Sequence, residues 1–302
     1  MNTTLIPIII LLVITFLSLV YWVWRFYYYI PNKEKEFAKK FFTKSLKQYS
    51  FEHIKEIKKI HNGYTNLSFH VKTTDNLEFQ LRFAKNSQIV DRSNEKKIIL
   101  FFNKQDYLYL DQYGNYIKKW IKGRDLNSSD VDDLFWKRIK SKIDYLHSVN
   151  VKELNILRHD YKKVLANQKI SKKLLVKYEQ YLPMLDKQEW VFSHNDLNYN
   201  NIIVNENKEF VFIDYEWSRI NHPYWDIVNF CRESHLSFEQ LETVANKFNI
   251  EFNDFIKMYF ICLVFAYNWT YENSFSFKIW KYRLGVKSQI SKTFSHLEKV
   301  AI

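Results

Sequence analysis

The N-terminal segment constrains this chain more than any other, because residues 2–24 carry no charged side chain. A helix of roughly 20 apolar residues crosses the hydrocarbon core of a bilayer, so this stretch is long enough. Aromatic residues gather at its C-terminal end, as they do at membrane–water interfaces: Tyr21, Trp22, Trp24, Tyr27, Tyr28 and Tyr29. The sequence therefore predicts a membrane-spanning anchor over residues 1–30, ended by Pro31 and Asn32.

Two other interpretations of this segment fit less well. A cleaved signal peptide needs a basic start and small residues at a cleavage site, and the segment has neither. A buried core helix seldom lacks charge over such a length. The basic residues that flank the stretch all follow it: Arg25, Lys33, Lys35, Lys39 and Lys40. The positive-inside rule therefore predicts that the rest of the chain lies in the cytoplasm.

The formal net charge of +12 suits anionic partners such as a phosphorylated cofactor or an acidic membrane surface. Nucleic acid is not expected as a partner, because the lysines are scattered and no nucleic-acid motif stands out. The chain has two cysteines, Cys231 and Cys262, which form no CxxC pair and no cluster with histidines. We therefore expect neither a disulfide framework nor a zinc site.

The hydrophobic pattern changes character near Gly123. Before it, an amphipathic helix is expected over residues 33–49 and another helix over 92–103, with strand-like runs at 51–60, 67–74, 77–84, 107–110 and 116–121. After it, helices are expected at 129–148, 158–164, 170–185, 237–248, 251–273 and 276–298. The pattern predicts an α+β, bilobal fold, with a small antiparallel lobe over residues 31–123 and a larger helical lobe over 124–302.

One motif in the second lobe carries chemistry. The run VFSHNDLNYNNIIV contains His194, Asp196 and Asn201, and Asp214 follows after two strand-like runs, NIIV and FVFI. A hydroxyl that attacks a phosphoryl group needs a carboxylate to orient it and take its proton, which Asp196 can supply. Mg²⁺ needs hard oxygen ligands, which Asn201 and Asp214 offer once a hairpin brings them together. We expect His194 to brace the loop by hydrogen bonds.

These residues resemble the choline/ethanolamine kinase branch of the protein-kinase-like superfamily, which also holds the aminoglycoside phosphotransferases. The family pattern of His-Asn-Asp, a later Asn and Ile-Asp-Tyr-Glu-Trp is matched at residues 194–196, 201 and 213–217. Further likenesses are the NGYTN loop, Arg82, the segment with Asp91, Arg92 and Glu95, the hinge-like WIKGRDL, and the helix with Asp226, Asn229 and Glu233. The resemblance covers about residues 50–290.

The resemblance implies ATP and Mg²⁺ as cofactors. It implies that Asp196 is the catalytic base beside His194, and that Asn201, Asp214 and Glu216 form the metal site. It places these residues around the nucleotide: Gly63, Thr65, Asn66, Arg82, Glu95 and Ile121. Arg82 would contact the phosphates and Glu95 would fix Arg82 by an ion pair, while the hinge at Ile121 receives adenine. The nucleotide loop departs from the family in having one glycine, Gly63, which makes its backbone less permissive.

The acceptor is expected to be a small amino alcohol. Residues 259–282 hold ten aromatic residues, and aromatic faces bind quaternary ammonium groups. The family builds its choline cage in this region, which implies Trp269, Trp280 and Tyr282 as substrate-binding residues next to Asp196. Packing of the helical core is the alternative role for each ring. Choline, giving phosphocholine, is therefore the expected substrate, in keeping with a membrane-attached role in lipid head-group supply.

Two alternatives stay open. Another kinase of the same fold would act on ethanolamine, thiamine, a sugar or an aminoglycoside. A non-catalytic, membrane-tethered protein with the kinase fold is the second alternative. Such proteins usually lose the base or a metal ligand, whereas Asp196, Asn201 and Asp214 are all present here. The sequence predicts no oligomeric state.

Overall fold

The computed structural model describes residues 5–60, 66–84, 90–272 and 276–300. The chain forms two compact units, the first comprising Met1–Asn86 and Gln105–Trp120, and the second Ser87–Lys104 and Ile121–Ile302. The segment of residues 87–104, which the sequence analysis assigned to the first lobe, is grouped by its contacts with the second unit. Each unit is described by itself below.

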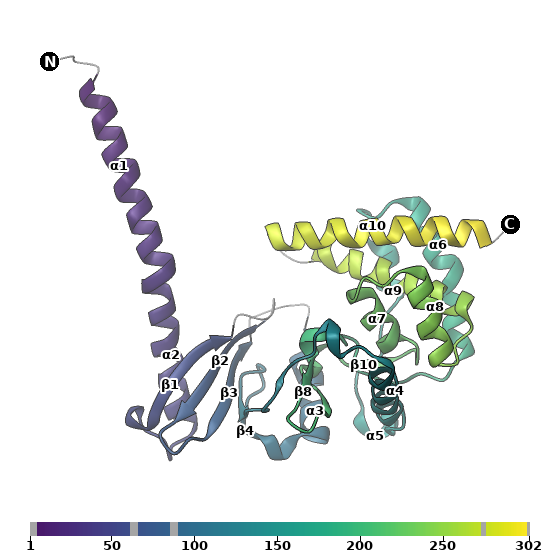
Figure 1. Cartoon of the computed structure of the whole chain (residues 1–302), viewed down its shortest axis with the longest axis horizontal. Helices are drawn as coiled ribbons and strands as arrows, with labels where there is room; N and C mark the ends of the chain where they lie inside the picture. Colours follow the sequence, from purple (N-terminus) through teal and green to yellow (C-terminus); the bar gives the residue numbers. More distant parts are fainter. Residues whose placement is uncertain (1–4, 61–65, 85–89, 273–275, 301–302) are drawn as a thin grey trace. The chain divides into compact units, whose positions relative to one another are not determined.

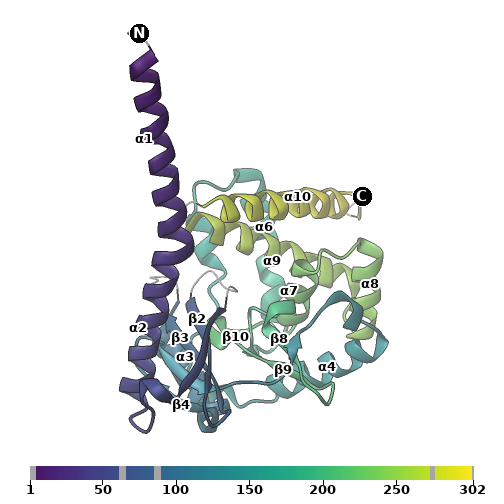
Figure 2. The same ribbon diagram turned by 60° about the vertical axis from the view of Figure 1, so that its left-hand side comes forward.

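The first unit begins with one continuous helical rod (Figures 1 and 2). α1 (Leu5–Trp24) leads through a single π-helical turn (Arg25–Tyr29) into α2 (Ile30–Ser45). The expected break at Pro31 and Asn32 is therefore wrong. Proline lacks an N–H group and crowds the carbonyl four residues before it. The π turn is closed by the Ile30 N–H bonding to the Arg25 carbonyl. It widens the helix just ahead of Pro31, around the carbonyl that the proline ring would otherwise crowd.

The rod is long and apolar enough to cross a membrane between Ile10 and Ser45, and none of its most apolar window is buried in the protein. Its second half packs on the sheet of the same unit. Ala38 and Phe42 are completely buried, and the ring of Phe41 lies against those of Phe83 and Tyr109. The amphipathic helix expected over residues 33–49 is thus present as α2.

α2 covers a five-stranded antiparallel sheet whose strand order is β1-β2-β3-β5-β4. The strands are β1 (Ile54–Ile60), β2 (Asn66–Thr73), β3 (Glu78–Ala84), β4 (Tyr107–Leu110) and β5 (Tyr116–Lys119). In β2 and β3, Phe69, Val71 and Leu81 are fully buried, so alternate residues of each strand face the core under α2. The small antiparallel sheet predicted from the sequence is confirmed.

The second unit is mainly helical. Its helices are α3 (Arg92–Phe102), α4 (Asp133–His147), α5 (Val151–Leu154), α6 (Lys172–Tyr181), α7 (Trp225–Glu233), α8 (Phe238–Lys247), α9 (Phe252–Glu272) and α10 (Phe277–Val300). Short strands form two small antiparallel sheets: β6 (Arg124–Asp125), β8 (Ile202–Val204) and β9 (Phe210–Phe212) in one, and β7 (Val191–Ser193) with β10 (Arg219–Asn221) in the other.

One expected helix of this unit is not formed. Residues 158–164 begin as an extended segment, because the Ile220 N–H donates to the Leu157 carbonyl and the His159 N–H to the Ile220 carbonyl, each at 2.9 Å. Only a short 3₁₀ helix (Lys162–Ala166) follows. Pairing with a strand distant in sequence overrides the local helical pattern.

α9 is the central helix of the second unit. It is apolar nearly all round, as befits a helix surrounded by protein, and Tyr259, Phe260 and Tyr267 are buried in the core. Much of the aromatic stripe over residues 259–282 therefore serves core packing, which was the alternative role for these rings.

Burial of His222, just after β10, should make stability depend on pH. The residue is 1% exposed, and burial lowers its pKa from 6.5 to about 4. Between those pH values the unfolded chain binds a proton that the folded protein does not, so stability is lost as the pH falls below 6.5. We expect a contribution of about 1.4 kcal/mol per pH unit across that range.

The substitution His222→Asn should remove this contribution to the pH dependence, because asparagine does not titrate. Its amide oxygen can still accept the Tyr224 N–H that now bonds to the imidazole at 3.2 Å. Denaturant unfolding at several pH values measures the effect, with the exposed His235→Asn as the matched control. An unchanged profile in His222→Asn would contradict the assignment.

Candidate active site

The loop after β7 carries Asp196 and is held in place by a buried carboxylate of α7. Asp226, which is completely buried, accepts hydrogen bonds from the Ser193 hydroxyl at 2.9 Å and from the N–H groups of His194 and Asn195 at 2.9 and 2.8 Å. Asn195 takes a left-handed conformation with φ 65°, which turns the chain directly before Asp196. The loop is thus fixed by the body of the unit.

His194 joins this loop to the one after β9. Its Nε2 donates a hydrogen bond to the Ile213 carbonyl at 2.9 Å, and its Nδ1 accepts one from the Asp196 backbone N–H at 3.4 Å. Burial lowers the pKa of His194, so the ring stays neutral and keeps one donor and one acceptor. These contacts support the bracing role expected from the sequence.

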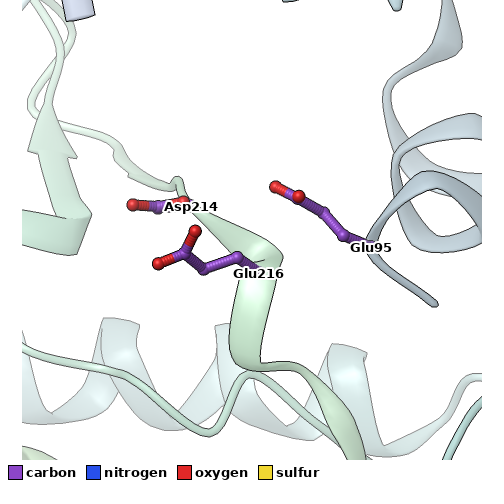
Figure 3. Close-up of side chains that lie close together, drawn as sticks. All are labelled: Glu95, Asp214 and Glu216. Atoms are coloured by element: carbon purple, nitrogen blue, oxygen red, sulfur yellow. The ribbon is translucent and has the colours of Figure 1, made fainter. Parts of the chain in front are cut away.

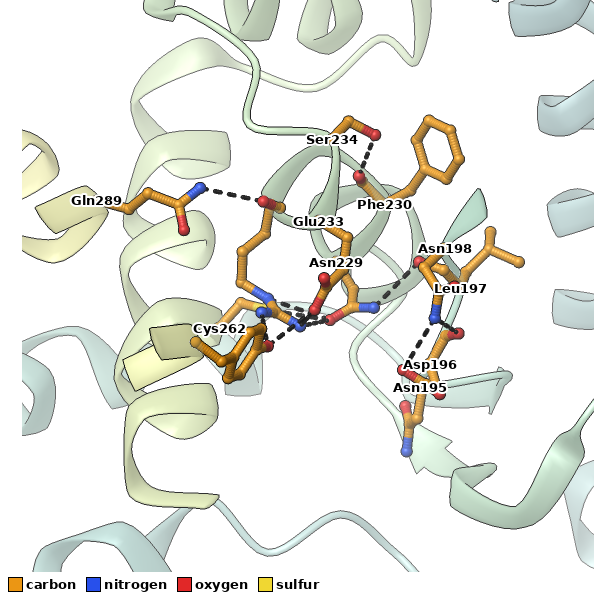
Figure 4. Close-up of polar contacts among 12 residues, drawn as sticks. Asn195, Asp196, Leu197, Asn198, Asn229, Phe230, Glu233, Ser234, Cys262 and Gln289 are labelled. Atoms are coloured by element: carbon orange, nitrogen blue, oxygen red, sulfur yellow. Dashed lines mark hydrogen bonds and ion pairs between the residues drawn. The ribbon is translucent and has the colours of Figure 1, made fainter. Parts of the chain in front are cut away.

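Two amides orient the carboxylate of Asp196, and Figure 4 shows one of them, that of Asn198. The Asn201 Nδ2 donates to Asp196 Oδ2 at 2.9 Å and to the Asp196 carbonyl at 2.7 Å. The Asn198 Nδ2 donates to Asp196 Oδ1 at 3.3 Å. Asp196, which the sequence predicted as the base, is therefore held by Asn201, which it predicted as a metal ligand.

The electrostatic environment of Asp196 is strongly negative. Its pKa is raised from 3.8 to about 8, first by burial and then by the negative charges of Glu233, Asp214 and Glu216. Arg232 opposes this shift. A cation arriving near these carboxylates would lower the pKa of Asp196 again and restore its ability to accept a proton.

Three carboxylates form the candidate metal centre (Figure 3). Asp214 follows β9, Glu216 lies in the next turn and Glu95 comes from α3, and one oxygen of each lies within 4.8 Å of the others. Hard carboxylate oxygens are the donors that Mg²⁺ prefers, so the set fits this ion. Asp214 has φ 64°, an uncommon conformation that is often kept at functional sites.

The hairpin of β8 and β9 brings Asn201 next to the Asp214 loop, as expected. Ile202 pairs with Phe212, and the Ile213 N–H donates to the Asn201 carbonyl at 3.0 Å.

The position of Glu95 was not foreseen, since the sequence analysis expected Glu95 to form an ion pair with Arg82. Within the second unit, Glu95 lies beside the carboxylates of Asp214 and Glu216, and Arg92 bridges Glu95 and Glu216 at 2.8 and 2.9 Å.

Arg92 should stabilise this carboxylate cluster. The side chains of Glu95 and Glu216 are only 2% and 3% exposed, and removing one partner of a buried ion pair costs roughly 3–5 kcal/mol. We expect Arg92→Leu to lower the free energy of unfolding by about 3 kcal/mol without divalent cations. Mg²⁺ should recover part of this loss, because its charge replaces that of the guanidinium.

Denaturant unfolding with and without Mg²⁺ measures both effects. Arg138→Leu, which removes an exposed arginine of the same unit, is the control. Arg92→Lys keeps the charge but not the planar fork and should give an intermediate loss. A loss in Arg92→Leu that Mg²⁺ leaves unchanged would contradict this role.

The nucleotide-binding residues predicted from the sequence lie mostly in the first unit. Gly63 and Thr65 fall outside the described residues, while Asn66 begins β2 opposite Ala84 of β3. Arg82 lies on β3, and its guanidinium donates to the Gly114 carbonyl at 2.9 Å. It also lies 4.2 Å from the Tyr116 ring centroid. Ile121 and Glu95 belong to the second unit, so the pairing of Arg82 with Glu95 stays a prediction.

A polar and aromatic cluster lies at the end of α7. The Tyr282 hydroxyl of α10 donates to Glu233 Oε1 at 2.8 Å, and the ring of Trp269 on α9 meets the Tyr282 ring edge-on at 6.1 Å between centroids. The structure thus brings Trp269 and Tyr282 together. Trp280 instead lies against Phe277, with ring centroids 5.4 Å apart, and is 41% exposed.

Arg232 organises this cluster and was missed by the sequence analysis. It is 6% exposed, and its Nη2 lies 2.6 Å from Glu233 Oε1 and 2.7 Å from Asn229 Oδ1. The Asn229 amide in turn donates to the Leu197 carbonyl at 3.1 Å, next to Asp196 (Figure 4). A continuous set of hydrogen bonds therefore links the Glu233 cluster to the loop of Asp196. The only sequence signal for Arg232 was its position directly before Glu233, a residue of the family-like helix.

Comparison with known proteins assigns this arrangement to a family. A sequence model of the choline/ethanolamine kinases matches residues 57–260, more than half of the chain, including both loops around Asp196 and Asp214. The chain belongs to the choline/ethanolamine kinase family. Members of this family are kinase-like phosphotransferases, and the α+β, bilobal kinase-like fold expected from the sequence is confirmed.

Relatives agree with this assignment. An uncharacterised protein of Mycoplasma pneumoniae is 28% identical over 229 residues, which cover 72% of this chain and 78% of that protein. An ethanolamine kinase of Plasmodium vivax has a TM-score of 0.65 at 20% identity and covers 80% of this chain and 83% of its own. The choline kinase LicA of Streptococcus pneumoniae has a TM-score of 0.65 at 16% identity, with coverages of 85% and 98%. LicA has also been solved in complex with AMP. At these identities, the solved structures establish the fold and not the acceptor.

Proposed function

We propose that this choline/ethanolamine kinase family member transfers the γ-phosphate of ATP to the hydroxyl of choline, giving phosphocholine and ADP. The family match and the AMP complex of LicA support the reaction type and the nucleotide. Asp196 as base, with Asp214 and Glu216 as hard ligands, supports phosphoryl transfer by the residues of this chain.

In the proposed reaction, Asp196 accepts the proton of the acceptor hydroxyl as that oxygen bonds to the γ-phosphorus and the bond to the ADP oxygen breaks. Asn201 and Asn198 keep the carboxylate in one orientation by donating to it. Mg²⁺ bound by Asp214 and Glu216, with the side-chain oxygen of Asn201 as a further ligand, would neutralise charge on the phosphates.

The remaining site residues keep the roles that the family resemblance implies, as parts of this proposal. Arg82 would contact the phosphates and Glu95 would hold Arg82. Gly63, Thr65 and Asn66 would contact the nucleotide, and Ile121 would receive adenine.

The observation that carries choline is the cluster of Glu233, Tyr282 and Trp269 close to the base. A trimethylammonium group has no proton to donate and is bound by aromatic faces with a carboxylate nearby. Burial, and then the negative charges of Glu233, Asp214 and Glu216, raise the pKa of Asp196 to about 8. A cationic acceptor and the ionised base therefore favour each other, whereas a neutral acceptor such as a sugar gains nothing from this arrangement.

We further propose that α1 anchors the protein in a membrane, with the catalytic residues on the cytoplasmic side. The apolar window of the rod is unburied, which argues against a core helix, and basic residues follow it. ATP is available in the cytoplasm, so the orientation agrees with the reaction.

Acceptor specificity tests the proposal. The full-length protein in detergent micelles is supplied with Mg·ATP, and kcat/KM is compared for choline, ethanolamine, thiamine and an aminoglycoside. We expect choline to have the highest value. A higher value for another acceptor would overturn the choline assignment, and no turnover with any acceptor would favour a non-catalytic protein with the kinase fold.

A further inference from the structure

The guanidinium of Arg232 meets three side-chain oxygens of the cluster at the end of α7. Its Nη2 forms an ion pair with Glu233 Oε1 at 2.6 Å, and its Nη1 donates to the Tyr282 hydroxyl oxygen at 2.5 Å. Its Nε and Nη2 both donate to Asn229 Oδ1, at 3.3 and 2.7 Å. One side chain therefore engages an oxygen of each of three neighbouring residues.

Arg232 is more deeply buried than the carboxylate with which it pairs. The side chain of Arg232 is 6% exposed, whereas that of Glu233 is 25% exposed, so a ligand meets the carboxylate first. Arginine stays protonated in proteins, and the pair therefore carries no net charge. Glu233 Oε1 also accepts the Tyr282 hydroxyl at 2.8 Å. An incoming cation thus meets a neutralised carboxylate, one oxygen of which already has two partners.

This arrangement affects two classes of ammonium group differently. A primary ammonium has three N–H donors, and each donor left without an acceptor in a shielded site lowers affinity. A trimethylammonium group has none and is bound by aromatic faces. The rings of Trp269 and Tyr282 stand at 85° to each other, so they present aromatic surface in two directions. The cluster therefore offers rings more readily than oxygens.

We propose that Arg232 makes the acceptor site select a quaternary over a primary ammonium, because it engages the oxygens that a primary ammonium needs. Arg232 is a positioning residue in this role, since it acts through Glu233 and Tyr282. The inference rests on the proposed function and adds the side chain that sets the preference among amino alcohols.

Arg232 also has a structural connection to the loop of the base. The Asn229 amide, which Arg232 holds, donates to the Leu197 carbonyl at 3.1 Å, next to Asp196. A substitution of Arg232 that disturbs this loop slows the reaction with every acceptor alike. A change in the order of acceptors separates selection from this structural contribution.

A series of acceptors that differ only in methylation tests the selection. Protonated ethanolamine, N-methylethanolamine, N,N-dimethylethanolamine and choline carry three, two, one and no N–H donors on nitrogen. With full-length protein in detergent micelles and saturating Mg·ATP, kcat/KM should rise with each methyl group. In Arg232→Met the preference for choline over ethanolamine should fall at least about tenfold, through a lower KM for ethanolamine, because the released oxygens accept its N–H groups.

Two further variants complete the experiment. Arg138→Met removes an exposed arginine of the same unit and should keep the wild-type order of acceptors. Arg232→Lys keeps the positive charge but replaces the planar fork by a single nitrogen, so the preference should fall less, by about threefold. Circular dichroism and thermal unfolding check each fold, and Arg232→Lys decides the test if Arg232→Met does not fold.

An unchanged order of acceptors in the folded Arg232 variants would overturn the proposal. An equal loss of kcat/KM for all four acceptors would also overturn it and leave Arg232 with a structural role. A wild-type protein that prefers ethanolamine, or phosphorylates none of the four, would refute the proposed function and this inference together. A preference for choline that survives in the Arg232 variants would refute the inference alone.

Discussion

Asp196→Asn is expected to lower kcat for phosphoryl transfer by roughly 100- to 10 000-fold, the contribution of a well-placed general base. The amide keeps the size of the side chain, and its oxygen can still accept the hydrogen bond from Asn201. It also resembles the protonated acid, the form that the folded protein favours below a pKa of about 8. We therefore expect the loss in rate without a loss of fold.

Single-turnover kinetics with saturating Mg·ATP measure the rate, and circular dichroism with thermal unfolding checks the fold. Asp186→Asn, an exposed aspartate of the same unit, is the matched control and should keep wild-type kcat. If Asp196→Asn turned over choline at a wild-type rate, Asp196 could not be the base.

Trp269→Leu is expected to raise the KM for choline about tenfold, because a cation–π contact with tryptophan contributes roughly 1–2 kcal/mol when it is shielded from water. The KM for ATP should stay constant, since the ring meets Tyr282 in the Glu233 cluster of the second unit. The preference for choline over ethanolamine should fall as well, because a primary ammonium depends less on an aromatic face.

Steady-state kinetics with both acceptors measure this effect. Tyr145→Leu removes an aromatic side chain that is 62% exposed and serves as control. Trp280 lies on Phe277 instead of Tyr282, so Trp280→Leu should change the KM for choline less than Trp269→Leu does. An equal rise in the KM for ATP in Trp269→Leu would indicate a general structural defect and contradict a role in acceptor binding.

The sequence predicted the parts of the site whose geometry is local. Asn201 and Asp214 are joined by a short hairpin, so their spacing and the two apolar runs were enough to place them near each other. Asp226 and Asn229 were noticed only through the family resemblance. Their function depends on α7 packing against the loop of Asp196, which is distant in sequence.

The parts that could not be predicted depend on tertiary contacts. Arg232 is buried between Asn229 and Glu233, although arginine is usually exposed and no pattern marks this one. Residues 158–164 had a helical pattern, but pairing with Ile220 keeps their beginning extended. Pro31 suggested a break, and the π turn before it keeps the rod continuous.

The most direct test of the account is the product of one reaction. Full-length protein is incubated with Mg·ATP and choline, and ³¹P NMR follows the γ-phosphate, with Asp196→Asn as the background. We predict that the phosphate appears as phosphocholine in proportion to the ADP formed, and that this signal is lost in the variant. ATP consumed to free phosphate without phosphocholine, or phosphocholine formed equally by the variant, would contradict the account.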